Sequence, residues 1–435
     1  MMVRLAPLLL VVAGCTHCTD GGGADDSGVM ADGAPHDALA EGTSDAAAIV
    51  SDWPGWRRLT ELDPTCPIDV PLDPSSMPKV NWVACSEGRL KCQQIDTTGW
   101  DDGTSTIHFG AGYISEGLSH IILLGRPVIR STAGTTFEED IISVAPWSTV
   151  ASFRLGPSNL GLCSGNFAVS KSTAYFLGQP ITHPTPLQVD KRPIAQLGET
   201  TFHFVPTDLN PWTQLGQAQT QQMWASDSTL AFDLEPVHII GRIDGNSTHV
   251  ALTSKTALTF PIVVGADVYA VDQTGTDGWA RIMRVNADGS MTQYRAVAGH
   301  RVATPASDGT TMYWTECYGT SDPTNNVQPN VEVWSAPYTN DPSTLASTAS
   351  KVATLGTNCV YDLQQLAQNG MFFATSAGTN YVYRKSDAKL MTFVNGGQRA
   401  TWYPLYISQS EYWSIEAQQG GANGVALTRI QLDPW

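Results

Sequence analysis

The sequence lacks an apolar run long enough to span a bilayer, and it has few basic residues. The apolar run at residues 5–12 is far shorter than the about 20 residues that a transmembrane helix needs. Only 24 Lys and Arg stand against 41 Asp and Glu, which gives a formal net charge of −17. Basic residues cluster no further than pairs such as Arg57-Arg58 and Lys191-Arg192. Because phosphate binding needs a basic footprint, this composition argues against nucleic acid as a partner.

Motifs for metal binding and catalysis are also scarce. The histidines show no paired ligand spacing and no His-Glu-x-x-His, and the Asp-Gly pairs lack the spacing of a calcium loop. Cys163 in Gly-Leu-Cys-Ser-Gly has the spacing of a nucleophile elbow, but a β repeat follows where that motif needs a helix. We therefore predict a structural role for Cys163, no metal and no cofactor, although a calcium ion in a central channel stays an open alternative.

The N-terminus has the layout of a secretory signal. Arg4 supplies the positive charge, residues 5–12 the apolar run, and Ala13-Gly14 the small residues before Cys15. This arrangement resembles the bacterial lipobox, which implies lipidation at Cys15. By similarity to Gram-negative lipoproteins, Thr16 after that cysteine implies the outer membrane, with the periplasmic or cell-surface side left open. The alternative is an ordinary signal peptide with a chance cysteine.

The segment after Cys15 differs in composition from the rest of the chain. Residues 16–52 carry eight acids, no Lys or Arg, and almost no large apolar residues. Such a segment buries too little apolar surface to offset chain entropy, so we expect a disordered spacer with a reach of about 35 Å. The predicted organisation is a signal peptide at 1–14, a lipidated cysteine and acidic linker at 15–52, and one folded domain at 53–435.

The folded domain is built from a degenerate repeat. A small or polar start, a Gly, Asn, Asp or Ser turn and a short strand with aromatic residues recur at a mean spacing of about 48 residues. Short alternating strands separated by turn residues surround each copy, and no helical run is evident. The copies are marked by Leu123, Tyr175, Phe232, Tyr269, Tyr313, Phe372 and Tyr412.

Tyr313-Trp314-Thr315-Glu316 resembles the YWTD repeat of receptor propellers, and the wider pattern resembles TolB-like propellers of bacterial exported proteins. The resemblance implies an all-β fold, a single β-propeller in which each marked strand is the second of its blade. We expect seven blades, with eight as the alternative. Because the last blade has only three strands of its own, we expect an N-terminal strand, 80–84 or 90–95, to close it.

Six cysteines in the domain of an exported protein predict disulfides, for which 15 pairings exist. Cys317 ends a second strand, and Cys359 precedes the first strand of the next blade, so we expect these two to pair. Cys85 and Cys92 flank a short hairpin and form a weaker expected pair. Cys66 is then left with Cys163.

Tryptophan is abundant, with 13 residues. Trp82, Trp224, Trp314, Trp334 and Trp413 lie on expected strands and are predicted to pack between blades. Those in expected loops are candidate ligand-binding residues, with caps over the blades as the alternative: Trp100, Trp147, Trp212 and Trp279.

The predicted function is a lipid-anchored envelope propeller that acts as a non-catalytic binding or scaffold module, with a glycan or an envelope protein as its ligand. The first alternative is an envelope enzyme that acts on polysaccharide or peptide, with its site at the channel mouth. The second is a purely structural spacer. The fold alone does not choose among them.

Overall fold

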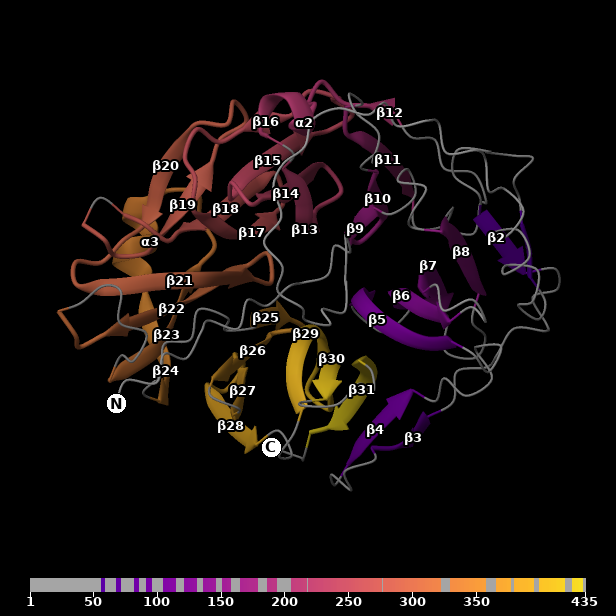
Figure 1. The fold of residues 1–435 in the computed structure, drawn as a ribbon. Coiled ribbons are helices and arrows are strands. Elements are labelled where there is room, and N and C mark those ends of the chain that lie inside the picture. Colours follow the sequence, from indigo (N-terminus) through magenta and orange to yellow (C-terminus); the bar gives the residue numbers. More distant parts are fainter. Residues whose placement is uncertain are drawn as a thin grey trace, which may run out of the picture.

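The structure of the protein is a computed structural model in which strands dominate. It describes residues 56–58, 68–71, 82–85, 91–95, 105–114, 121–130, 136–145, 151–157, 165–178, 186–193, 205–216, 218–275, 277–321, 329–356, 365–376, 379–394, 399–418 and 425–432. Cys15 and residues 1–52 lie outside this set. Within it, the strands form seven antiparallel sheets, which follow one another around a common centre in chain order (Figure 1).

The first three sheets contain the strands up to β16, except for β3 and β4. The first sheet consists of β5 (Ser105–Ile114), β6 (Ile121–Arg130), β7 (Thr136–Ala145) and β8 (Ala151–Pro157), extended by β2 (Ile68–Pro71) and β1 (Trp56–Arg58). The second consists of β9 (Gly165–Val169), β10 (Thr173–Gly178), β11 (Gln188–Pro193) and β12 (Val205–Pro206). The third consists of β13 (Gln219–Ala225), β14 (Thr229–Glu235), β15 (Ile239–Asp244) and β16 (Ala251–Leu252).

The next three sheets have four strands each. The fourth consists of β17 (Leu258–Val264), β18 (Asp267–Asp272), β19 (Arg281–Val285) and β20 (Met291–Arg295). The fifth consists of β21 (His300–Ser307), β22 (Thr311–Tyr318), β23 (Asn330–Pro337) and β24 (Ser350–Gly356). The sixth consists of β25 (Gln365–Gln368), β26 (Met371–Ser376), β27 (Thr379–Arg384) and β28 (Lys389–Val394).

The seventh sheet joins the two ends of the chain. It consists of β29 (Arg399–Ile407), β30 (Glu411–Gln418), β31 (Val425–Gln431), β4 (Cys92–Ile95) and β3 (Trp82–Ala84). The strand at 90–95 therefore closes the last blade, as expected, and the strand at 80–84 pairs outside it. First strands of neighbouring sheets contact each other from β9 through β13, β17, β21 and β25 to β29, and β29 contacts β5. This arrangement is a β-propeller.

The repeat explains the packing between sheets. Every marked residue lies on the second strand of its sheet, in β6, β10, β14, β18, β22, β26 or β30, as predicted. Successive side chains on a strand point to opposite faces, so the aromatic pairs pack against both neighbouring sheets. Tyr313 stacks on Phe372 with ring centroids 4.7 Å apart, and Phe373 stacks on Tyr412 at 4.3 Å. The number of blades, seven or eight, stays a prediction.

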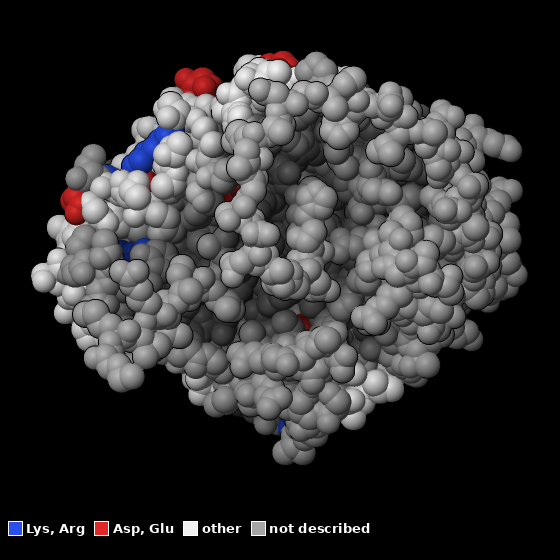
Figure 2. Space-filling view, viewed as in Figure 1, with Lys and Arg blue, Asp and Glu red and all other residues white. Residues whose placement is uncertain are grey.

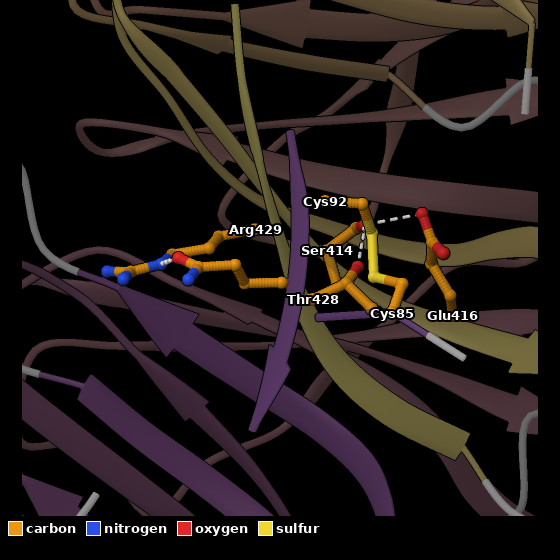
Figure 3. The surroundings of a disulfide bond; sticks show 7 residues. Cys85, Cys92, Ser414, Glu416, Thr428 and Arg429 are labelled. Atoms are coloured by element: carbon orange, nitrogen blue, oxygen red, sulfur yellow. Dashed lines mark hydrogen bonds between the residues drawn. A yellow bond between two sulfur atoms is a disulfide. The ribbon is translucent and has the colours of Figure 1, made fainter. Parts of the chain in front are cut away.

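A disulfide (Figure 3) and a cation–π contact reinforce the closing strands. Cys85 and Cys92 are joined across their hairpin with Cα atoms 5.5 Å apart, which is the weaker of the expected pairs. Arg429 on β31 donates to Gln93 Oε1 at 2.9 Å and lies 4.3 Å from the centroid of the Trp82 ring. The closing hairpin is thus held by side chains as well as by the ladder.

Two details differ from the sequence-based expectation. The described residues include two short helices, α2 (Pro211–Gln214) and α3 (Pro342–Thr348), where no helix was expected. In α3, Asp341 caps the amides of Ser343 and Thr344, a start signal present in the sequence.

No helix of the described residues is long and apolar enough to cross a membrane.

The five tryptophans that were predicted to pack between blades differ in how deeply they are buried. Trp314 and Trp413 are fully buried. Trp82, Trp224 and Trp334 are half-buried, so the strands that carry them leave part of the ring in solvent. Alternation along the strand was the correct signal, but the depth of each ring depends on its neighbours in the next sheet.

Candidate functional site

The two faces of the ring carry different connections. Strands alternate in direction within each sheet, so the end of a second strand lies on the same face as the start of the next first strand. We call this the connection face. In the described part of the chain it carries the turns 235–239 and 272–281 and the inter-sheet connections 206–219, 252–258 and 295–300.

Two of the four candidate ligand-binding tryptophans lie on the connection face. Trp212 is in α2, in the connection between the second and third sheets, and Trp279 is in the turn between β18 and β19. Both are half-buried. Trp100 and Trp147 lie outside the described residues.

The remaining predicted cysteines are described only in part. Cys317 lies near the end of β22, is fully buried and is disulfide-bonded. Its partner is outside the described residues, as are Cys66, Cys163 and Cys359. The Cys317–Cys359 and Cys66–Cys163 pairings therefore stay predictions.

A cluster of two carboxylates and one imidazole lies on the connection face at the turn between β14 and β15. Asp233, Glu235 and His238 each offer a donor atom, and these atoms all lie within 4.8 Å of one another. Asp233 and Glu235 are two residues apart on β14, so they lie on the same face of the strand. His238 follows the turn, with its Nδ1 atom 4.0 Å from Glu235 Oε1.

The backbone fixes the position of this turn. His238 adopts a φ of 51°, in the left-handed region, where histidine is among the residues found more often than most. The amide of Leu258, at the start of β17, donates to the His238 carbonyl at 3.0 Å. The turn of the third sheet is thus attached to the first strand of the fourth.

Asp233 is buried, at 4% exposure, and its Oδ1 atom has no hydrogen-bond partner. The Nδ1 atom of His238 is likewise buried without a partner. The pKa of Asp233 is raised to about 7, chiefly by burial and then by the nearby Glu235, while a backbone hydrogen bond from Leu234 acts in the opposite direction. The cluster therefore holds polar atoms that the protein itself leaves unsatisfied.

Buried acids in the fourth and fifth sheets have cations instead. Glu316 Oε1 accepts from Arg295 Nη2 at 2.7 Å and from Trp314 Nε1 at 2.8 Å, and Glu316 Oε2 lies 3.0 Å from His300 Nδ1. Asp272 lies 2.5 Å from Lys255 Nζ. These acids form ion pairs and hydrogen bonds that hold strands and sheets together, so they have a structural role.

The Asp233 cluster does not match the sequence patterns of metal ligands on helices or in calcium-binding loops, so the sequence did not predict it. The available signal was Asp-Leu-Glu at strand spacing, followed after a Pro by His238. Period-two alternation places both carboxylates on one face. What the pattern did not show is that, among the described residues, no cation from another sheet pairs with Asp233.

No family model matches this chain, and no curated protein does. Among solved structures it is similar to the β-propeller domain of the Trilobed protease from Pyrococcus furiosus, with 9% identity over 75% of this chain and 97% of that chain and a TM-score of 0.46. It is also similar to YCF48 from Cyanidioschyzon merolae, with 12% identity over 75% and 95% of the two chains and a TM-score of 0.41.

A third similar structure is the putative TolB from Agrobacterium tumefaciens, with 11% identity over 58% of this chain and 83% of that chain and a TM-score of 0.33. Values this low carry no information about ligand or activity. The class of the protein, an all-β β-propeller, is defined by its own strands and their pairing.

Proposed function

We propose that this chain is a propeller held at the bacterial cell envelope by a lipid on Cys15, and that it binds a glycan non-catalytically on its connection face. The observation that carries the proposal is that Trp212 and Trp279 both lie on that face, in separate connections. They come from different sheets, and neither ring is fully buried. Exposed aromatic surface costs solubility unless it is used, and flat rings stack on sugars.

The surface of the described residues agrees with a neutral or mixed ligand. In Figure 2, acidic and basic side chains of described residues lie near one another at the upper left of the view. A tethered spacer and a ring with one aromatic face fit a module that presents a binding surface away from the membrane. An envelope protein is the alternative ligand.

Glycan-array binding of the full-length protein tests the proposal. Trp212→Ala and Trp279→Ala should each weaken binding by about tenfold, because an aromatic contact contributes about 0.5–1.5 kcal/mol. Trp224→Ala is the matched control, since Trp224 is equally half-buried but lies within β13. Glycan binding that survives both loop substitutions, or no glycan binding at all, contradicts the assignment; capture of an envelope protein would then favour the alternative ligand.

The anchor has a separate test. Cys15→Ser should abolish lipid attachment and move the protein from the detergent phase to the aqueous phase. A Cys15→Ser variant that still partitions with membranes would show that the tether is not a lipid on this residue.

A second candidate function, hydrolysis of an envelope polymer, is favoured by one observation. Asp233 and Glu235 are close carboxylates, and the pKa of Asp233, at about 7, is in the range of a general acid. Against this, Asp233 is 4% exposed and its Oδ1 is fully buried, so a substrate has little access to it. Turnover of a bound glycan that is lost in Glu235→Gln would establish the enzyme.

A further inference from the structure

The Asp233 cluster carries an inference that is independent of the glycan proposal. We infer that Asp233, Glu235 and His238 form a binding site for a divalent transition metal of the zinc type, on the connection face between the third and fourth sheets. The sequence-based expectation was that the protein holds no metal. The inference stands on three observations about this cluster.

The first observation is the set of donors. Two carboxylates and one imidazole supply oxygen and nitrogen, and zinc takes both. Calcium prefers oxygen ligands alone, so the imidazole disfavours it. Copper(I) favours thiolate and thioether sulfur, which this group of three does not supply. The donor set therefore favours Zn²⁺ over Ca²⁺ and Cu(I). By intrinsic affinity Mn²⁺ is a weaker competitor and Cu²⁺ is a stronger one.

The second observation is that the buried donor atoms are unsatisfied. Asp233 is more than nine-tenths buried, and its Oδ1 atom has no hydrogen-bond partner. His238 Nδ1 is also buried without one. A buried polar atom without a partner costs about 1–3 kcal/mol. A single cation bound in the cluster would satisfy both of these atoms and would also neutralise the charge of the second carboxylate.

The third observation is the geometry. The three donor atoms lie within 4.8 Å of one another, and a tetrahedral zinc with bonds of about 2.0–2.2 Å needs its donors about 3.3–3.6 Å apart. The group therefore has to contract by about 1 Å. Asp233 is fixed in the sheet, whereas the side chains of Glu235 and His238 are 26% and 40% exposed and are free to turn inward.

The position of the cluster also matters. Asp233 lies two residues after Ala231 on β14, and Ala231 packs with Leu258, Val268 and Ala270 of the fourth sheet. The carboxylate therefore faces the junction between sheets, and a metal there would add a cross-link at the point where the turn is bonded to β17. Three protein ligands leave a fourth position open to water or to a ligand on the connection face.

Calorimetric titration of the chelator-treated full-length protein with Zn²⁺ tests the inference. We expect one Zn²⁺ to bind per chain, with a rise in melting temperature, and Ca²⁺ to produce neither effect. Asp233→Asn and His238→Asn should each weaken Zn²⁺ binding by more than about 100-fold, because even outer hydrogen-bonding partners of metal ligands contribute about 10–100-fold. Asn is chosen at His238 because it tolerates a left-handed φ.

Two matched variants control for adventitious zinc. Asp277→Asn removes the same charge from the corresponding turn of the fourth sheet, where the side chain is 57% exposed. His249→Gln removes an exposed histidine that is paired with Asp208. Both should keep the affinity of the wild type. The absence of Zn²⁺ binding in the wild type, or affinity lost in His249→Gln and kept in both cluster variants, overturns the site.

A spectroscopic measurement separates loss of the ligand from loss of the fold. Co²⁺ in place of Zn²⁺ should give the visible bands of a site with nitrogen and oxygen donors. We expect these bands to disappear in His238→Asn while its circular dichroism stays that of the wild type. Unchanged Co²⁺ bands in that variant would remove His238 from the site and contradict the inference.

Discussion

Glu316 in the fifth sheet and Asp233 in the third are both buried carboxylates near the ends of second strands, but they have different surroundings. Glu316 accepts hydrogen bonds from Arg295 of the preceding sheet and from Trp314 of its own sheet. The imidazole of His300, also in its own sheet, contacts the other carboxylate oxygen. Asp233 has Glu235 as its charged neighbour on the same strand and a buried oxygen without a partner. Asp233 lies one residue after the marked Phe232 and Glu316 lies three residues after the marked Tyr313. A buried carboxylate on a second strand thus belongs either to a network of packing contacts or to an open site.

The difference shows that the role of a buried acid on a second strand depends on the side chains that reach it across the junction between sheets. Arg295 comes from the last strand of the fourth sheet and reaches the second strand of the fifth. At the third sheet, the buried atoms of Asp233 and His238 remain unsatisfied. Four substitutions test this contrast, and they are given in descending order of the expected change in stability.

Removing the cation from the paired acid should have the largest effect. Arg295→Met leaves Glu316 buried without its strongest partner, which we expect to destabilise the fold by about 3 kcal/mol, because breaking a buried ion pair typically costs about 3–5 kcal/mol. Urea unfolding with intact disulfides measures this. Lys389→Met is the control, since Lys389 is 56% exposed and lies 3.8 Å from Asp387, which is itself 35% exposed. A loss below about 1 kcal/mol in Arg295→Met would show that Glu316 does not depend on Arg295.

Removing the charge from the unpaired acid should have the opposite sign. The pKa of Asp233 is raised from 3.8 to about 7 in the fold, so its ionisation costs stability as pH rises from about 4 to about 7, and the full cost is present above that. In chelator at pH 8, Asp233→Asn should stabilise the fold by about 2 kcal/mol, less than the full linkage because a buried amide also needs partners.

The pH dependence checks the sign of that prediction. Between pH 4 and 7.5, the wild type should lose stability relative to Asp233→Asn, and the two should converge at the acid end of the range. Thermal unfolding in chelator follows both. Parallel curves would mean that Asp233 stays unperturbed in the fold.

The imidazole beside the paired acid should matter less than the guanidinium. His300→Gln removes the 3.0 Å contact to Glu316 and the stacking of His300 on Tyr318, with ring centroids 4.4 Å apart. We expect a loss of about 1 kcal/mol in urea unfolding, since the ring pair contributes about that much and the glutamine amide still donates to Glu316. An effect as large as that of Arg295→Met would make His300 the main partner.

The smallest effect is expected from the neighbour of the unpaired acid. Glu235→Gln removes the charge that adds to the raised pKa of Asp233, so it should stabilise the apo protein by about 0.5 kcal/mol at pH 8. In the Asp233→Asn background the same change should have no effect, because no charge is left to repel. A full double-mutant cycle measures this, and additivity would show that the two carboxylates do not interact.

The architecture was largely predictable from the sequence. The aromatic residues and turn residues of the repeat identified the second strand of every sheet, and the three-stranded last blade predicted closure by an N-terminal strand. These features are local, because turn chemistry and alternation act over a few residues. The helix α3 was not predicted, because a helix of seven residues has little periodicity to detect. Asp341 at its N-cap and Pro342 at its first position are nevertheless typical of a helix start.

The site was predictable only in part. The sequence placed Trp212 and Trp279 in loops, and the structure brings both to the connection face. It also contained Asp233, Glu235 and His238 within six residues, where Glu235 and His238 alone give no metal motif. Whether a buried carboxylate is neutralised depends on side chains from another sheet, as with Arg295 and Glu316.

Composition and turn chemistry in the sequence are enough to identify the acidic N-terminal segment, the repeat and the second strand of each described sheet, because each follows from residues close together in the chain. The sequence also indicates that an N-terminal strand closes the last blade, but it leaves 80–84 and 90–95 as candidates. Only the tertiary structure decided which carboxylates are paired and which of the half-buried tryptophans share a face. The physical reason is that burial and charge pairing depend on distances across sheet junctions, where residues about 20 to 50 positions apart in the chain meet within a few ångström.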